Sequence, residues 1–440
     1  MSSLSIGSST SSGIDVDATV SQILYAERAT ERLMEAQQAR LQLYASSLSQ
    51  VQTEVSVLKS KVNALKDISG VLNTKLATSS NTSVASASAS TTAVTGKHTL
   101  LVSRLATTST YYSDVIVGAK LTHGIFSLSV GSGPAKTITI DDSNDTLSGF
   151  VDYLNGIDAG VTASTLADAN GTRLVLVSEQ SGSAGQISVS GSAMPFAWNK
   201  GADGLNAQFA VDGIPLESST NTPSEFIPGV TLTLSGTSAS EVQLTVASDT
   251  ARARQAAADF VSAYNTVIKE INGQFSYDAA NKTAGVLSGD PAIRGLQSAL
   301  LSNAAYAKDE DSSIVNLSAL GVKMENDGTL TIDSSRLDEM LKTRFADVQD
   351  FFQSTEVEGF ARHFGASLDD LTDSIEGPIQ VDLNGIKAEQ ESLSDQIEAY
   401  EVRMEMRQQL LLEQFSKIDA MLRQLPLLQA QLTAQLGSLE

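Results

Sequence analysis

A long run of helical periodicity near the start of the chain constrains the fold most. Large apolar side chains recur there at alternating spacings of three and four. We name this set the N-terminal seam: Leu41, Tyr44, Leu48, Val51, Val55, Leu58, Val62 and Leu65. The spacing predicts a helix with one apolar stripe, continued by Ile68, Leu72 and Leu76. Such a helix is marginal in water by itself, so the stripe needs a partner surface.

A second run of the same kind lies near the other end of the chain. We name it the C-terminal seam: Leu393, Ile397, Tyr400, Met404, Leu411, Phe415, Ile418 and Leu422. Arg407 occupies one of the apolar positions between them. The central region separates the two seams, so a coiled coil formed by pairing them would be antiparallel; alternatively, each seam is core within a helical bundle. Both interpretations predict an elongated helical domain.

The region between the seams is built differently. Residues 78–248 carry only 6 bases and 13 acids, and they alternate apolar and polar side chains in short runs separated by turn residues. This pattern predicts short strands of a sheet or sandwich, with one helix at 145–157. Later in the chain, Asp290 and Pro291 form a typical helix start. Residues 321–333 read as a small β-hairpin turning at an Asp-Gly pair.

Net charge and cysteine content exclude several classes of function. A net charge of −22 repels nucleic acid and anionic lipid, so we expect neither as a partner. The chain has no cysteine, which excludes disulfides and thiolate metal sites. No run is long and apolar enough for membrane insertion, and the first residues lack the basic and apolar parts of a secretory signal. We therefore expect a protein that is cytoplasmic or exported without a cleaved signal peptide.

The candidate chemical motifs do not combine into a catalytic site. None of His98, His123 and His363 has a second ligand at metal-binding spacing, so we expect no metal. The adjacent pairs at 141–142 and 369–370 are carboxylates of the kind that are normally solvated. No phosphate-binding glycine loop or nucleophile motif is complete. We expect no enzyme and no cofactor, and a function carried by a protein-binding surface.

Several stretches of the chain resemble one protein family. They include "GIDVDATVSQILYAERA" at 13–29, "AQFAVDGIPLESSTNTPSEFIPGVTLTL" at 207–234 and "AGVLSGDPAIRGLQSAL" at 284–300. In the same order along the chain, these stretches are similar to the flagellar filament cap proteins, also called hook-associated protein 2. The resemblance covers about residues 13–422.

The resemblance implies a fold, a location and a set of partners. The fold is α+β and multidomain: the terminal helices form a coiled-coil or helical-bundle leg domain, and the central domains are mainly β and sandwich-like. The family is exported through the flagellar type III channel and forms a homo-oligomeric ring at the distal tip of the extracellular filament. Its members contact flagellin, promote its folding and insertion, and prevent its loss. An export chaperone binds their C-terminal region.

Mapping the family onto this chain gives expected domain boundaries. They are a flexible N-terminal leg segment at 1–40, two halves of the helical domain at 41–77 and 249–425, a β region at 78–248 with an inserted domain near 110–205, and a C-terminal leg segment at 426–440. In the last segment Leu428, Leu432 and Leu436 need a partner to cover them. Pro426 departs from the helical tail that the family pattern implies, and its effect on the final helix stays open from the sequence.

Three alternatives to a filament cap remain open from the sequence. A hook–filament junction protein would share helical ends and a β middle. An adhesin would use the central β domains, whose Ser/Thr-rich and weakly charged surface suits hydrogen bonding to host glycans or mucin. A secreted hydrolase is the poorest alternative, because it requires an acid/base pair that the sequence does not contain.

Overall fold

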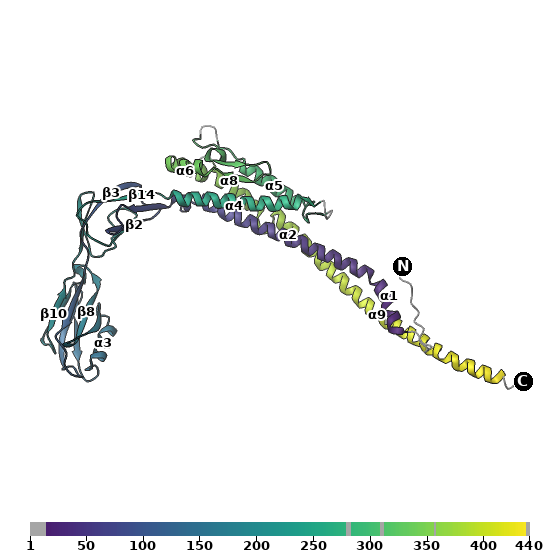
Figure 1. Ribbon diagram of the computed structural model, residues 1–440, viewed down its shortest axis with the longest axis horizontal. Helices are drawn as coiled ribbons and strands as arrows, with labels where there is room; N and C mark the ends of the chain where they lie inside the picture. The colour runs from purple at the N-terminus through teal and green to yellow at the C-terminus, as the bar shows by residue number, and fades with distance from the viewer. Residues whose placement is uncertain (1–14, 279–282, 309–311, 356–357, 437–440) are drawn as a thin grey trace. The chain divides into compact units, whose positions relative to one another are not determined.

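The computed structural model describes residues 15–278, 283–308, 312–355 and 358–436 (Figure 1). They divide into two compact units. The helical unit comprises the described residues of 1–66, 256–340 and 346–440, and the β unit comprises 67–255 with 341–345. Long helices and several small antiparallel sheets together confirm the α+β multidomain class. The domain boundaries expected from the sequence stay predictions.

Helices from both chain ends pair in the helical unit. They are α1 (Val16–Glu27), α2 (Ala29–Lys66) and α9 (Pro378–Leu436) (Figure 1). Two hydrogen bonds define their direction. Gln37 Nε2 donates to Glu389 Oε1 at 3.2 Å, and Gln52 Nε2 donates to Gln380 Oε1 at 3.1 Å. Rising residue numbers on α2 therefore meet falling numbers on α9, so the two helices are antiparallel.

Shorter elements complete this unit around an aromatic cluster. They are α4 (Thr250–Phe275), α5 (Pro291–Ala304), α6 (Ser334–Thr343), α7 (Phe345–Gln353), α8 (Phe360–Leu371), and the hairpins β15 (Tyr277–Asp278) with β16 (Thr283–Ala284) and β17 (Val322–Met324) with β18 (Leu330–Ile332). Phe260, Phe360 and Phe364 are buried, with ring centroids 5.6 to 5.7 Å apart. Asp290 Oδ1 accepts the Ala292 and Ile293 amides, which confirms the predicted start of α5. The hairpin at 321–333 is also confirmed.

The first part of the β unit contains seven strands. They are β1 (Lys75–Ser79), β2 (Ala85–Ala89), β3 (Gly96–Arg104), β11 (Ala207–Val211), β12 (Ile214–Ser218), β13 (Val230–Leu234) and β14 (Val242–Ser248). Five form an antiparallel sheet in the order β1-β14-β3-β11-β12, and β13 pairs with β2. Alternate residues of β13 and β14 are buried, which is the period of a strand with one face in the core.

The second part of the β unit has its own core. Its elements are β4 (Thr108–Ser113), β5 (Gly124–Val130), β6 (Lys136–Ile140), α3 (Leu147–Gly156), β7 (Val161–Asp168), β8 (Gly171–Ser181), β9 (Ile187–Ala193) and β10 (Trp198–Ala202). The strand orders are β10-β4-β8-β7 and β6-β5-β9. Phe126 of β5 and Phe150 of α3 are at most 1% exposed in this core. The helix predicted at 145–157 is confirmed as α3, whose N-cap is Thr146.

The helices differ from the sequence expectations in two places. Within the leg segment at 1–40, expected to be flexible, residues 16–27 and 29–40 are helical, and Val20 and Leu24 of the first helix are buried against α9; residues 1–14 of that segment lie outside the described residues. The first long helix ends at Lys66 instead of continuing to Leu76. Asp67 Oδ1 accepts hydrogen bonds from Ser69 there, which favours a turn.

Pro426, whose effect the sequence left open, lies inside a continuous α9. The proline removes one N–H donor, but this part of α9 is exposed. Water can therefore hydrate the carbonyl oxygen that loses its partner, and the helix persists. No helix among the described residues is long and apolar enough to cross a membrane.

Candidate functional site

The N-terminal seam supplies the most deeply buried stripe of the long helices. Six of its members, from Leu48 to Leu65, are 0% exposed. Leu41 and Tyr44, at the end nearer α1, are half-buried. The structure thus places most of this predicted set in the core of the helical unit, where it holds α2.

The C-terminal seam is covered much less. Leu393 and Leu411 are 5% and 4% exposed. Five members are half-buried: Ile397, Tyr400, Met404, Phe415 and Leu422. Ile418 is 43% exposed, so the expectation that it packs in the seam was wrong. Among the described residues, the apolar cluster between α1 and α9 extends to Phe415, so α1 leaves Ile418 uncovered.

Beyond Phe415, α9 presents an apolar stripe to solvent. We name it the C-terminal stripe: Ile418, Met421, Leu425, Leu428 and Leu432, each between 43% and 65% exposed. It contains two of the three leucines expected to need a partner; the third, Leu436, is the last residue of α9. Residues 424–436 carry no charge. An exposed apolar stripe of this length is typical of a surface that another helix covers.

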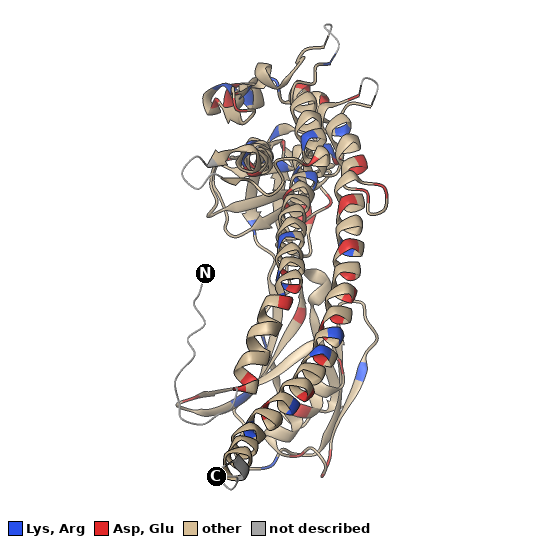
Figure 2. Ribbon diagram, turned by 90° about the vertical axis from the view of Figure 1, so that its right-hand side faces the viewer, with Lys and Arg blue, Asp and Glu red and all other residues tan. Residues whose placement is uncertain are grey.

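The last part of this stripe, from Leu425 on, differs in charge from the rest of the long helices. Figure 2 shows acidic and basic segments distributed along the helices, whereas the end of α9 carries neither. Docking onto the uncharged part therefore depends on apolar contact and little on salt concentration.

The exposure difference within the C-terminal seam leads to a prediction. Leu411→Asp places a carboxylate in the buried α1–α9 cluster and should cost about 3 kcal/mol of local stability, with loss of α1 helicity. Ile418→Asp, at a position 43% exposed, should leave the helicity unchanged. Circular dichroism at 222 nm and thermal unfolding check both variants. Equal losses of helicity and stability in the two variants would contradict this assignment of contacts.

A polar layer separates the α1 contacts from the buried part of α2. Arg407 Nη2 donates to Glu27 Oε1 at 3.0 Å, and its Nε lies 3.2 Å from Glu27 Oε2. Tyr400 Oη donates to the Glu27 carbonyl at 2.7 Å. These hydrogen bonds explain how a charged residue occupies a seam position: Arg407 pairs with the end of α1.

A second polar group joins three helices of the unit. Asp290, the N-cap of α5, is 2% exposed, and its Oδ2 accepts a hydrogen bond from Tyr44 Oη at 2.7 Å. Burial, together with this hydrogen bond, raises the pKa of Tyr44 above its ordinary value. Burial and then the charge of Asp290 raise the pKa of Asp382 on α9. The two carboxylates therefore oppose each other when both are ionised.

This repulsion gives a pH-dependent prediction. Asp382→Asn should raise the free energy of unfolding at pH 7 by less than about 1 kcal/mol, since solvent screens the site. The folded-state pKa of Asp382 is raised, so its destabilising effect is absent below the unfolded-state pKa and appears as pH rises through the folded one. Urea unfolding at pH 3 and pH 7, with Asp395→Asn as the exposed control, checks the sign. An increase in the free energy of unfolding at pH 3 equal to the increase at pH 7 would contradict this prediction.

A groove lies beside α2 in the same unit. Its volume is about 860 Å³, and Leu33, Leu41, Leu43 and Val286 supply apolar side chains, with Arg40 at the edge. Leu33 is 72% and Leu43 is 55% exposed. The groove adds a second apolar surface on the helical unit.

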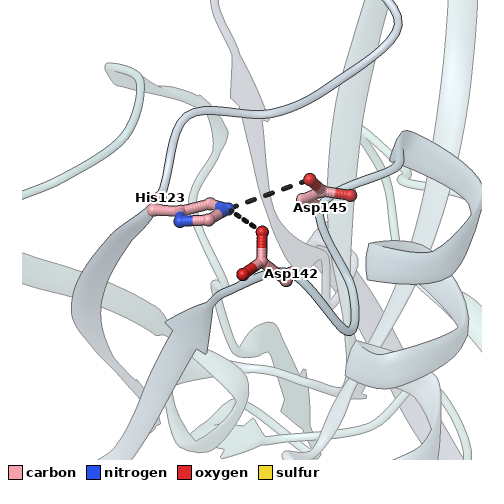
Figure 3. Close-up of side chains that lie close together, drawn as sticks. All are labelled: His123, Asp142 and Asp145. Atoms are coloured by element: carbon pink, nitrogen blue, oxygen red, sulfur yellow. Dashed lines mark ion pairs between the residues drawn. The ribbon is translucent and has the colours of Figure 1, made fainter.

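The β unit brings together a histidine and two aspartates that the sequence did not associate. His123 Nε2 lies 3.7 Å from Asp142 Oδ1 and 3.8 Å from Asp145 Oδ2 (Figure 3). These atoms resemble a metal ligand set. However, Lys120 Nζ is 2.6 Å from Asp145 Oδ2, and this hydrogen bond raises the pKa of Lys120. The lysine already supplies the cation, so we assign the group as an ion-pair cluster that ties two loops together.

Comparisons with known proteins cover both units. Residues 12–109 and 204–426 match the family models described as the N-terminus and the C-terminus of flagellar hook-associated protein 2. The B-type flagellar hook-associated protein 2 of Pseudomonas aeruginosa is 31% identical over 428 residues, which cover 90% of this chain and 89% of that protein. The flagellar hook-associated protein 2 of Escherichia coli K12 is 28% identical over 466 residues, covering 99% and 98%.

A solved structure is similar to most of this chain. The crystal structure of the D1-D2-D3 domains of the flagellar cap protein FliD from Escherichia coli matches with a TM-score of 0.62 at 26% identity. The match covers 78% of this chain and 99% of that one.

Proposed function

The chain belongs to the flagellar hook-associated protein 2 family, and from that membership we propose that it is the structural cap at the distal end of the bacterial flagellar filament. The observation that carries this proposal is similarity over nearly the whole chain to relatives of that name, together with the fold match to a flagellar cap protein. The place of action is therefore extracellular, at the filament tip.

We propose that the cap works as an oligomeric ring whose helical units contact flagellin. In this account the C-terminal stripe docks on an apolar helix of flagellin and holds each new subunit while it folds and inserts. Its five exposed side chains and the absence of charged residues from 424–436 support this role. Because the cap holds each flagellin subunit at the tip, it also prevents loss of flagellin into the medium.

Before export, the same end of the chain serves a second partner. We propose that residues 426–440 bind a flagellar export chaperone, which covers Leu428 and Leu432 while the protein is still in the cell. Both leucines are more than half exposed in the folded chain. Export then proceeds through the flagellar channel.

We also propose that the protein catalyses no reaction and needs no cofactor. Its curated relatives are named flagellar hook-associated protein 2, a name that refers to no reaction. The adhesin alternative, with glycans or mucin bound by the β unit, stays a prediction from surface composition; direct binding of the purified protein to a glycan array tests it.

Immunogold labelling of intact filaments separates a cap from a hook–filament junction protein. An epitope inserted in an exposed turn, such as the one at Asp212 and Gly213, places the label away from both cores. We expect gold at the distal ends of filaments and none at the hook. Gold confined to the hook end of the filaments would overturn the proposed function.

A further inference from the structure

Helix α1 is attached to the rest of the helical unit by a very small apolar cluster. Its buried members are Val20 and Leu24 of α1 and Leu411 of α9. Between Leu24 and Leu48 the only buried residue of α1 and α2 is Glu31. This cluster is therefore separate from the core that holds α2, and it can open without disturbing that core.

The polar layer lies where the two helices α1 and α2 meet. The junction is Arg28, which ends α1 and pairs with Glu31 Oε1 at 3.1 Å. Glu31 is 4% exposed, and its other oxygen, Oε2, is buried with no hydrogen-bond partner among the described residues. A buried carboxylate oxygen without a partner weakens the packing around it. The packing is thus weakened at the point where α1 would hinge.

Glu27 holds the end of α1 on α9 at this point. Its carboxylate makes a bidentate contact with Arg407, and its carbonyl accepts the Tyr400 hydroxyl. The ion pair is partly exposed, with 40% of the arginine and 32% of the glutamate side chain accessible. A bidentate pair of this kind fixes geometry, but water and salt can compete with it.

We infer that α1 is a detachable strap, held on α9 by the Glu27–Arg407 pair and the Val20–Leu24–Leu411 cluster. Detachment uncovers Leu411, Leu412 and Phe415. These residues directly precede the C-terminal stripe on the same helix. Release of α1 therefore extends the exposed apolar surface of α9 toward the N-terminal end of that helix. The strap thereby regulates how much of α9 a partner helix can cover.

The test compares two charge reversals on α9 by hydrogen–deuterium exchange and mass spectrometry. Arg407→Glu breaks the contact with Glu27 of α1, whereas Lys417→Glu breaks the Glu413–Lys417 pair, both of whose members belong to α9. We expect exchange of residues 16–27 to rise about fivefold in Arg407→Glu. Exchange across 48–66 should stay unchanged in both variants, which shows that the core of α2 remains folded.

A charge-swapped double variant, Glu27→Arg with Arg407→Glu, completes the design. We expect it to restore most of the lost protection of α1, because the ion pair can form again with its partners exchanged. Unchanged exchange of α1 in Arg407→Glu, or an equal rise in Lys417→Glu, would overturn the strap.

The expected effect on binding rests on the proposed function, and purified flagellin is the probe that tests it. We expect Arg407→Glu to bind flagellin severalfold more tightly than the unsubstituted chain, since a larger fraction has α1 detached. Unchanged affinity alongside faster exchange of α1 would overturn competition between α1 and flagellin. Failure of the unsubstituted chain and all variants to bind flagellin would instead count against the proposed function.

Discussion

We expect aspartate in place of Leu58 to unfold the helical unit, and aspartate in place of the neighbouring Val57 to leave it folded. Leu58 is 0% exposed on the buried face of α2, whereas Val57 is 48% exposed. The buried substitution removes a leucine from the core and puts a carboxylate in its place. Together these effects cost roughly 5 kcal/mol or more, which approaches the total stability of a typical domain.

Urea unfolding followed by circular dichroism at 222 nm measures this difference directly. We expect Leu58→Asp to lose most of its helical signal in buffer, and Val57→Asp to unfold with a midpoint close to that of the unsubstituted chain. A cooperative transition of normal midpoint for Leu58→Asp would mean that the N-terminal seam does not hold the helical unit together.

The second large effect is on function and leaves the fold intact. Replacing Leu425, Leu428 and Leu432 by glutamine should abolish capping while the melting temperature stays unchanged, because all three side chains are at least half exposed. If each leucine is buried against flagellin, the three losses amount to at least about 4 kcal/mol of binding, or roughly a thousandfold in affinity.

Glutamine keeps the helix propensity of this segment, so the substitution tests the apolar surface alone. The matched control replaces Gln424, Gln429 and Gln431 by alanine, which alters exposed polar positions of the same turns. Cells carrying the leucine variant should release monomeric flagellin into the medium, and cells carrying the control should not. Normal filaments with the leucine variant would exclude the C-terminal stripe as the flagellin contact.

Periodicity in the sequence predicted those parts of the fold whose stability depends on local pattern. The run from Leu48 to Leu65 is buried because a three-four spacing places all its members on one face of a helix. The cap of α5 at Asp290 and the hairpin at 321–333 follow from short-range hydrogen bonding. In each case neighbours within a few residues determine the structure.

What the sequence did not predict depends on contacts between distant residues. Periodicity near Arg28 does not indicate where α1 ends, because the deciding groups, Tyr400 and Arg407, lie far along the chain. The His123 cluster is assembled from two loops whose proximity only the sheet establishes. Ile418 has the spacing of a core residue, yet it is exposed because α1 does not reach it.

The most direct test of the capping account uses cells that lack this gene. Such cells should shed unpolymerised flagellin and carry absent or stunted filaments. Purified protein added to the medium should then restore filament growth from the exposed ends and stop the loss of flagellin. Normal filaments in the deletion strain, or continued shedding after folded protein is added, would contradict the account.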